Sequence, residues 1–134
     1  MPFVLDASIA VCWAFDDEDY PGAAVTLDRI RTDEAKVPSL WWFEVRNALI
    51  VNERRGRLTE DDVTFFLRGL SRLGVTFDRD PDEGGVLMLA RRHRLTVYDA
   101  SYLELANRES LPLATLDSEL ATAARKERLK LIGD

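Results

Sequence analysis

The sequence predicts an α/β protein, a three-layer α/β/α sandwich around a mainly parallel sheet of about five strands. Short apolar runs alternate with amphipathic stretches along the chain, which is the pattern of strands separated by helices. A length of 134 residues corresponds to one domain, and we expect a single domain over residues 1–134. A composition of 46% hydrophobic and 31% charged residues is typical of a globular chain that buries a core.

The individual elements follow from two spacings. Apolar side chains three and four residues apart predict helices, and short apolar runs between polar or turn-forming residues predict strands. The expected strands cover residues 3–5, 35–37, 74–77, 95–98, 113–116 and 129–132. The expected helices cover residues 8–15, 23–30, 40–55, 59–73, 80–93, 100–107 and 118–126.

Capping signals support three of these helix ends. Gly56 follows the helix over 40–55, and glycine is favoured just after a helix C-terminus. Thr59 with Asp62 three residues later is a helix start. Asp80 is followed by a proline in the first-turn position and by Glu83 three residues after the cap, so we expect a helix to begin at Asp80.

Residue counts exclude several classes of protein. A single cysteine, Cys12, forbids an internal disulfide, and with the single histidine, His93, it rules out a structural zinc site of four Cys or His ligands. No apolar run approaches the roughly 18 residues of a membrane-spanning helix. The N-terminus lacks the basic region of a signal peptide, so we expect a cytoplasmic protein. The glycines form no phosphate-binding GxGxxG loop, and there is no GxSxG nucleophile elbow.

Four predicted strands are followed by an aspartate. We expect no site role for Asp78, which follows the strand over 74–77, so the candidates are Asp6, Asp99 and Asp117. Ligands of open parallel sheets bind outside the carboxyl ends of the strands, so these three residues can converge on one edge of the sheet. Helix capping is the alternative for each one taken singly, because aspartate is a favoured N-cap. Clustered negative charge requires an offset such as a metal ion, which favours a site when all three are considered together.

Glu44 is a fourth candidate because its surroundings are almost entirely apolar. It lies within residues 40–51, where an unpaired carboxylate on a buried helix face would be costly. Asn47 shares its helix face. The alternatives are an exposed stripe on the helix or a local contact with Arg46.

Four carboxylates with little histidine or cysteine suit a hard cation, Mg²⁺, for which Mn²⁺ often substitutes. The reaction that such a site favours is phosphodiester hydrolysis by a metal-activated water, which requires no protein nucleophile.

At this point the residues resemble a known family, the PIN-domain ribonucleases, and within it the VapC toxins of VapBC toxin–antitoxin systems. The resemblance extends over essentially the whole chain. It rests on the order of four motifs: Asp6-Ala7-Ser8, Glu44-Val45-Arg46-Asn47-Ala48-Leu49, Asp99-Ala100-Ser101-Tyr102-Leu103 and Thr115-Leu116-Asp117. One departure is the stretch from Lys126 to Leu129, where family members often have a glycine.

The resemblance implies an endoribonuclease toxin with catalytic, metal-binding acids at Asp6, Glu44, Asp99 and Asp117. Ser8, Asn47 and Thr115 would then support the acids or position the substrate. It also implies a homodimer and a cognate VapB-type antitoxin that inhibits the enzyme by occupying the acidic groove.

The net charge of −6, from 24 acidic and 18 basic residues, argues against nonspecific nucleic-acid binding, but two bound divalent ions would offset part of it. The arginines that are candidate RNA contacts are Arg46, Arg54, Arg55, Arg57, Arg91, Arg92 and Arg94. Solvated helix ends are the alternative explanation for these clusters. Three other functions stay open on the sequence: a Mg²⁺-dependent phosphatase acting on a small phosphoester, a receiver-like signalling module, and a catalytically silent regulatory subunit.

Overall fold

A computed structural model describes residues 1–18 and 20–133 of the chain, and among these residues it contains four strands and seven helices. The strands are β1 (Phe3–Leu5), β2 (Ala35–Pro38), β3 (Val75–Asp78) and β4 (Leu113–Ala114). The helices are α1 (Ala7–Cys12), α2 (Pro21–Arg29), α3 (Leu40–Arg54), α4 (Glu60–Leu70), α5 (Glu83–His93), α6 (Val97–Glu109) and α7 (Ser118–Lys126).

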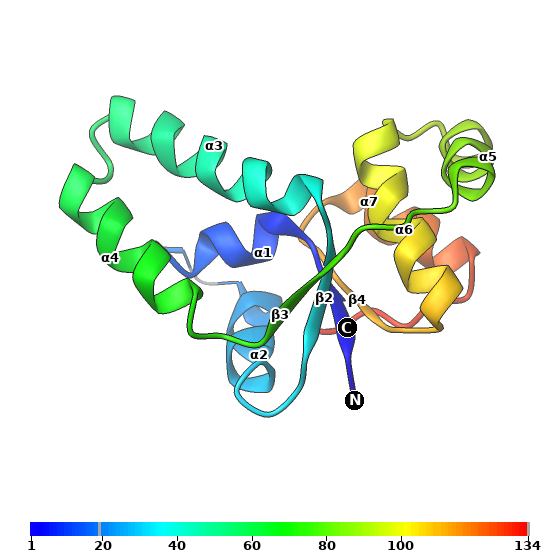
Figure 1. Ribbon diagram of the computed structural model, residues 1–134, viewed down its shortest axis with the longest axis horizontal. Helices are drawn as coiled ribbons and strands as arrows, with labels where there is room; N and C mark the ends of the chain where they lie inside the picture. The colour runs from blue at the N-terminus through cyan, green and yellow to red at the C-terminus, as the bar shows by residue number, and fades with distance from the viewer. Residues whose placement is uncertain (19, 134) are drawn as a thin grey trace.

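All paired strands of the sheet are parallel, in the order β3-β2-β1-β4. Figure 1 shows the sheet between two helical layers, with α1 to α4 on one side and α5 to α7 on the other. This arrangement confirms the predicted α/β/α fold class. The chain leaves β1 toward β2 and β3 and later returns to the other side of β1 as β4, so the strand order reverses at β1.

The predicted strand over residues 129–132 is reduced to a single bridge between Leu131 and Leu113. The turn before it contains Arg128 in the left-handed conformation, with φ of 63°, at the place where a glycine is often found in the family that the sequence resembles. The chain therefore makes this turn at some conformational cost.

The strand predicted over residues 95–98 is wrong, because α6 begins at Val97. The Thr96 side chain accepts a hydrogen bond from the Asp99 backbone N–H and so caps the helix. Val97 and Tyr98, whose apolar character suggested the strand, have no strand partner and are 49% and 64% exposed. Asp99 consequently lies in the first turn of a helix rather than at the end of a strand.

Two helix ends also differ from expectation. The N-cap of α5 is Asp82, not Asp80; its side chain accepts from the Gly85 backbone N–H, so the helix begins at Glu83. Helix α1 ends at Cys12, before the predicted Phe15. By contrast, Thr59 and Asp62 form the full reciprocal capping box at the start of α4.

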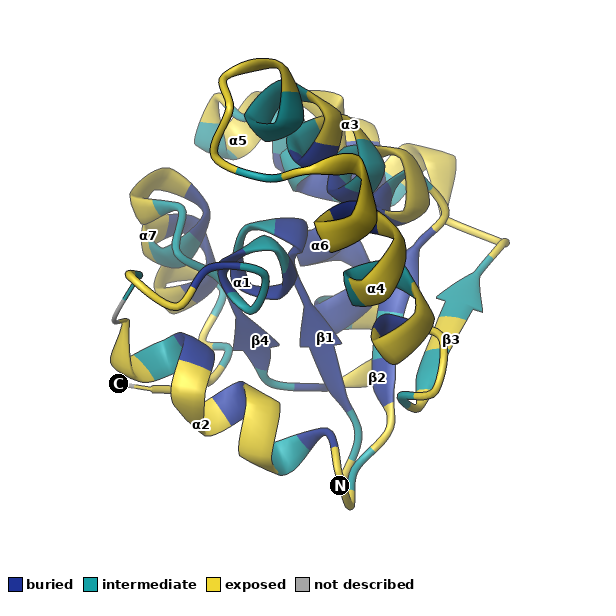
Figure 2. Cartoon of the chain, turned by 90° about the vertical axis from the view of Figure 1, so that its left-hand side faces the viewer, coloured by how far each residue is buried: buried dark blue, intermediate teal, exposed yellow. Residues whose placement is uncertain are grey.

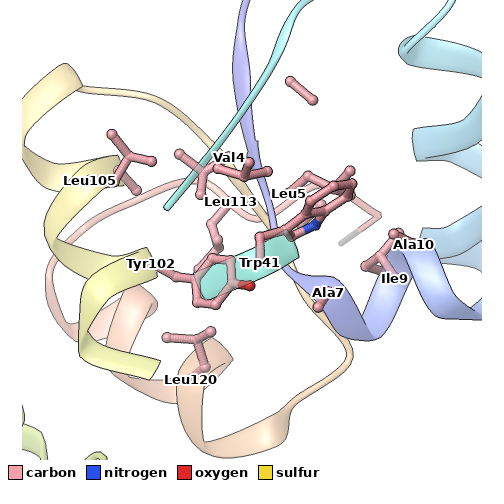
Figure 3. Packing of buried hydrophobic residues seen from close by; sticks show 14 of the residues in the cluster. Val4, Leu5, Ala7, Ile9, Ala10, Trp41, Tyr102, Leu105, Leu113 and Leu120 are labelled. Carbon is pink, nitrogen blue, oxygen red and sulfur yellow. The ribbon is translucent and has the colours of Figure 1, made fainter. Parts of the chain in front are cut away.

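The core lies where α1, α3 and α6 pack against the sheet. Phe3, Val4 and Leu5 of β1 are fully buried, and Figure 2 shows that the central strands are buried whereas β3 at the edge is partly exposed. Figure 3 shows side chains from both helical layers meeting at β1, with Trp41 on one side and Tyr102 on the other. Within the described residues, no helix has the length and apolar character needed to cross a membrane.

Candidate functional site

The candidate site lies at the carboxyl edge of the sheet, where the strand order reverses. Asp6 directly follows β1, and the segment from Thr115 to Asp117 follows the adjacent strand β4. Glu44 lies in the second turn of α3, which begins soon after β2, and Asp99 lies in the first turn of α6. Chain segments far apart in sequence thus bring the acids to one edge, as ligand sites of open parallel sheets require.

Asp6 is the buried centre of this group, with 6% of its surface exposed. One of its carboxylate oxygens, Oδ2, accepts hydrogen bonds from Ser8 Oγ at 2.8 Å and from Thr115 Oγ1 at 2.6 Å. Burial raises the pKa of Asp6 and the charge of Asp117 adds to the rise, although both hydrogen bonds oppose it. The two hydrogen bonds therefore hold the carboxylate in place, but burial still disfavours its charged form.

Ser8 and Thr115 also link the two strand ends to each other. Ser8 Oγ accepts from the Leu116 backbone N–H at 3.0 Å, and Thr115 Oγ1 accepts from the Asp117 backbone N–H at 3.0 Å. The structure thus places these two residues against Asp6. Asn47 differs: it is exposed and, among the described residues, makes no side-chain hydrogen bond.

Glu44 is held by a residue to which sequence analysis gave no role, Tyr102. The Tyr102 hydroxyl donates to Glu44 Oε1 at 2.5 Å across 58 positions of sequence. Figure 3 shows the Tyr102 ring packed in the core, with its hydroxyl oxygen on the side of Trp41. Burial raises the pKa of Glu44, the hydrogen bond lowers it, and the charges of Asp6 and Asp99 raise it. Tyr102 lies three residues after Asp99, and this spacing was the available signal for a shared helix face.

The remaining acids complete a mutually repelling cluster. Burial raises the pKa of Asp99, and the charges of Asp117, Asp6 and Glu119 raise it further. Asp117 caps α7 by accepting from the Leu120 backbone N–H at 2.9 Å, so the capping role and the site position coexist. Glu119 was not predicted; its position two residues after Asp117 in the first turn of α7 was the only signal.

Three acids elsewhere in the chain whose side chains are mostly buried, Asp78, Glu104 and Glu127, each have a basic partner, unlike the acids of the site. Asp78 and Glu104 both pair with Arg108, at 2.7 and 2.9 Å. Glu127 binds His93 at 2.6 Å and Arg92 at 2.9 Å. Within residues 1–18 and 20–133, none of the four predicted site acids makes an ion pair. The cluster therefore has an uncompensated negative charge.

The donor set of this cluster fits a hard divalent cation. As the side chains lie, no three acidic, histidine or cysteine groups of the described residues form a ready-made metal cage. Mg²⁺, however, is usually held by one or two carboxylates and several waters rather than by an all-protein cage. The carboxylate oxygens are suitable ligands for such an ion. The ion would offset the unpaired negative charges, whose burial and mutual repulsion raise the pKa values of Asp6, Glu44 and Asp99.

The arginines predicted to contact RNA fall into two groups, those whose side chains bind other residues of the protein and those without such a partner among the described residues. Arg46 lies over the Trp42 ring at 4.1 Å and donates a hydrogen bond to the Trp42 carbonyl, and none of the described ion pairs joins it to Glu44. Arg57 pairs with Asp17 and Glu18, and Arg92 pairs with Glu127. Of the described ion pairs and side-chain hydrogen bonds, none involves the remaining four, Arg54, Arg55, Arg91 and Arg94. Figure 1 shows the C-terminal end of α3, which carries Arg54, pointing away from α6 and α7.

Comparisons with known proteins agree with this geometry. The family model of the PIN domain matches residues 3–126. Ribonuclease VapC3 of Pyrobaculum aerophilum is 32% identical over 125 residues, which cover 90% of this chain and 93% of that protein. Among solved structures, PAE2754 from Pyrobaculum aerophilum superposes with a TM-score of 0.72 at 26% identity, covering 92% of this chain and 84% of that one. VapC20 of Mycobacterium tuberculosis, described as a sarcin-ricin loop cleaving toxin, superposes with a TM-score of 0.61 at 8% identity, covering 90% and 94%, and so supports the fold alone.

Proposed function

The chain belongs to the PIN domain family, in its VapC group, and on this premise we propose that it is a divalent-metal-dependent endoribonuclease toxin. The observation that carries the proposal is the cluster of Asp6, Glu44, Asp99 and Asp117, gathered at one sheet edge without a basic partner in the described chain. Such a cluster is expensive unless it binds a cation, and perturbed carboxyl pKa values are typical of functional sites.

Asp6, Glu44, Asp99 and Asp117 would together hold Mg²⁺, with Mn²⁺ as a substitute. When bound, the ion supplies a water of lowered pKa as the nucleophile and stabilises the charge on the leaving oxygen. The chain's own part is positioning: Ser8 and Thr115 hold one oxygen of Asp6, and Tyr102 holds one oxygen of Glu44. Attack of water on phosphorus with cleavage of the bond to the 3′ oxygen, which takes up a proton, would leave a 5′-phosphate and a 3′-hydroxyl on the RNA products.

The proposal extends to organisation and partners. We expect a single catalytic domain over residues 1–134, acting in the cytoplasm as a homodimer and neutralised by a cognate VapB-type antitoxin that occupies the acidic groove. Exposed apolar side chains next to the acids, Trp42 and Phe43 on α3 and Tyr98 on α6, are available for such contacts, with exposures of 44%, 70% and 64%.

The decisive experiment incubates the purified chain, free of antitoxin, with total RNA in Mg²⁺, Mn²⁺ or EDTA. Discrete cleavage in either metal, absent in EDTA and in Asp99→Asn, is the expected result. Asp80→Asn is the matched control, because Asp80 is exposed and makes no hydrogen bond or ion pair within the described part of the chain.

Parallel reactions separate the rival functions. Hydrolysis of p-nitrophenyl phosphate with RNA left intact would indicate the small-molecule phosphatase. Folded protein that cleaves neither substrate in any metal would indicate the silent regulatory subunit. Either result would refute the ribonuclease proposal, provided that RNA pools from several growth conditions give the same answer.

A further inference from the structure

A cavity of about 320 Å³ lies between the C-terminal end of α5 and the exposed face of α7. Its polar lining consists of His93, Arg94, Ser118, Glu119, Thr122 and Lys126. Nothing in the catalytic proposal uses this cavity, although Ser118 directly follows Asp117 in the chain. The negative charge of Glu119 raises the pKa of Asp99, so one end of the cavity adjoins the acidic site.

The cavity has an acidic end and a basic end. Ser118, Thr122 and Lys126 are spaced four residues apart, so they form one stripe along α7 that leads away from the acids. At a rise of 1.5 Å per residue, Lys126 lies about 12 Å along the helix from Ser118. Glu119 is at the acidic end, where the cation proposed for the site would offset its charge.

The basic end of the cavity has two cationic side chains, Arg94 and Lys126. Across the described ranges, 1–18 and 20–133, neither Arg94 nor Lys126 makes an ion pair or a side-chain hydrogen bond. His93 beside them is occupied by Glu127 at 2.6 Å. Arg94 ends α5 in the left-handed conformation, with φ of 54°, and this fixes where its side chain leaves the backbone.

We propose that this cavity is a subsite for a backbone phosphate of the RNA strand next to the cleaved phosphodiester, bound by Arg94 and Lys126. The inference rests on the proposed ribonuclease function. An RNA strand that spans the cavity would place the phosphate to be cleaved at the acids, which require a cation. The neighbouring phosphate would then meet the unpaired side chains of Arg94 and Lys126. Arg94 suits this role because a guanidinium binds phosphate oxygens in pairs, and Lys126 adds a point charge.

The test measures RNA affinity separately from catalysis. Asp99→Asn protein in Mg²⁺ is titrated with a fluorescein-labelled oligouridylate at several salt concentrations, alone and with Arg94→Gln, Lys126→Gln or both. Each substitution should raise the Kd about three- to tenfold. Each should also make the slope of log affinity against log salt shallower by about 0.7. Arg94→Lys should restore most of the salt slope.

Arg72→Gln is the matched control, since Arg72 is exposed and precedes β3, at the opposite edge of the sheet from the acids. If Arg94→Gln and Lys126→Gln weaken binding no more than this control, the subsite is refuted, while RNA cleavage by the wild type leaves the ribonuclease proposal standing. If the wild type neither binds nor cleaves RNA, both fail. If Arg94→Gln or Lys126→Gln, made in the chain that keeps Asp99, alters p-nitrophenyl phosphate turnover while RNA binding is unchanged, the cavity belongs to a small phosphoester and the proposal is overturned.

Discussion

Replacing Tyr102 with phenylalanine removes a single oxygen atom from the support of the site. The Tyr102 side chain is fully buried, so the phenylalanine ring keeps the packing against the core. The hydroxyl is lost, and with it the 2.5 Å hydrogen bond to Glu44 and a contact with the backbone of Ala7. The substitution therefore isolates the hydrogen bond from the packing.

The expected cost follows from these contacts. A hydrogen bond to a charged group contributes about 1.5–3 kcal/mol, and partial rehydration of the half-buried Glu44 recovers some of it, which leaves about 1–2 kcal/mol. For a domain of this size the loss corresponds to a fall in Tm of about 3–8 °C. RNA cleavage should fall as well, because Glu44 loses the donor that orients it. The acid limb of the pH–activity profile should move upward, since the hydrogen bond lowers the pKa of Glu44.

The assay is a double-mutant cycle of Tyr102→Phe with Glu44→Gln and Glu44→Ala, measured by urea unfolding at neutral pH without metal. If the hydroxyl acts through Glu44, Tyr102→Phe should cost about 1–2 kcal/mol less in the Glu44→Ala background. An equal cost in both backgrounds, or cleavage unchanged in Tyr102→Phe, would refute the reasoning.

Three further predictions concern charge and capping. Burial and the charge of Asp117 raise the pKa of Asp6, so the metal-free protein should gain stability as the pH falls from neutral toward the ordinary carboxyl range. For the same reason Asp6→Asn should raise the Tm of the metal-free protein. It should also abolish the stabilisation by Mg²⁺. Glu127→Gln should cost about 1–3 kcal/mol at neutral pH. Burial opposes ionisation of Glu127, but hydrogen bonds from His93 and two neighbours lower its pKa to about 2, so the cost measured by urea unfolding should shrink as the pH falls from about 5 toward 3. Thr59→Ala removes the capping box of α4 and should cost about 1 kcal/mol by the same assay, with RNA cleavage unaffected.

The convergence of Asp6 and Asp117 could be predicted from the sequence because it follows from topology. Each lies just beyond a recognisable apolar strand, and parallel strands bring their carboxyl ends to one edge. Asp99 reaches the same edge by another route. The local pattern over residues 95–98 suggests a strand, yet the Thr96 cap and the absence of a neighbouring strand make this segment the start of a helix.

The residues that sequence analysis did not assign were those whose role depends on helix rotation. A helical pattern places Tyr102 on one face of α6, but it does not say that the tip of this side chain meets Glu44 across the sheet. The same holds for Glu119, whose effect on Asp99 depends on how α7 packs beside α6. Arg54 and Arg55 show the opposite case: they follow Glu44 in sequence, but the length of α3 carries them to its far end.

The hydrogen bond from Thr115 to Asp6 joins residues 109 positions apart, and this separation matters while the chain is being made. A nascent polypeptide that has emerged only as far as α6 contains Asp6, Glu44 and Asp99 but lacks β4, Thr115 and Asp117. Asp6 then lacks the Thr115 donor and the neighbouring strand β4, although its other hydroxyl donor, Ser8, has already been made. The four acids of the candidate site can therefore come together only after β4 and Asp117 have been added, when 117 of the 134 residues have been made.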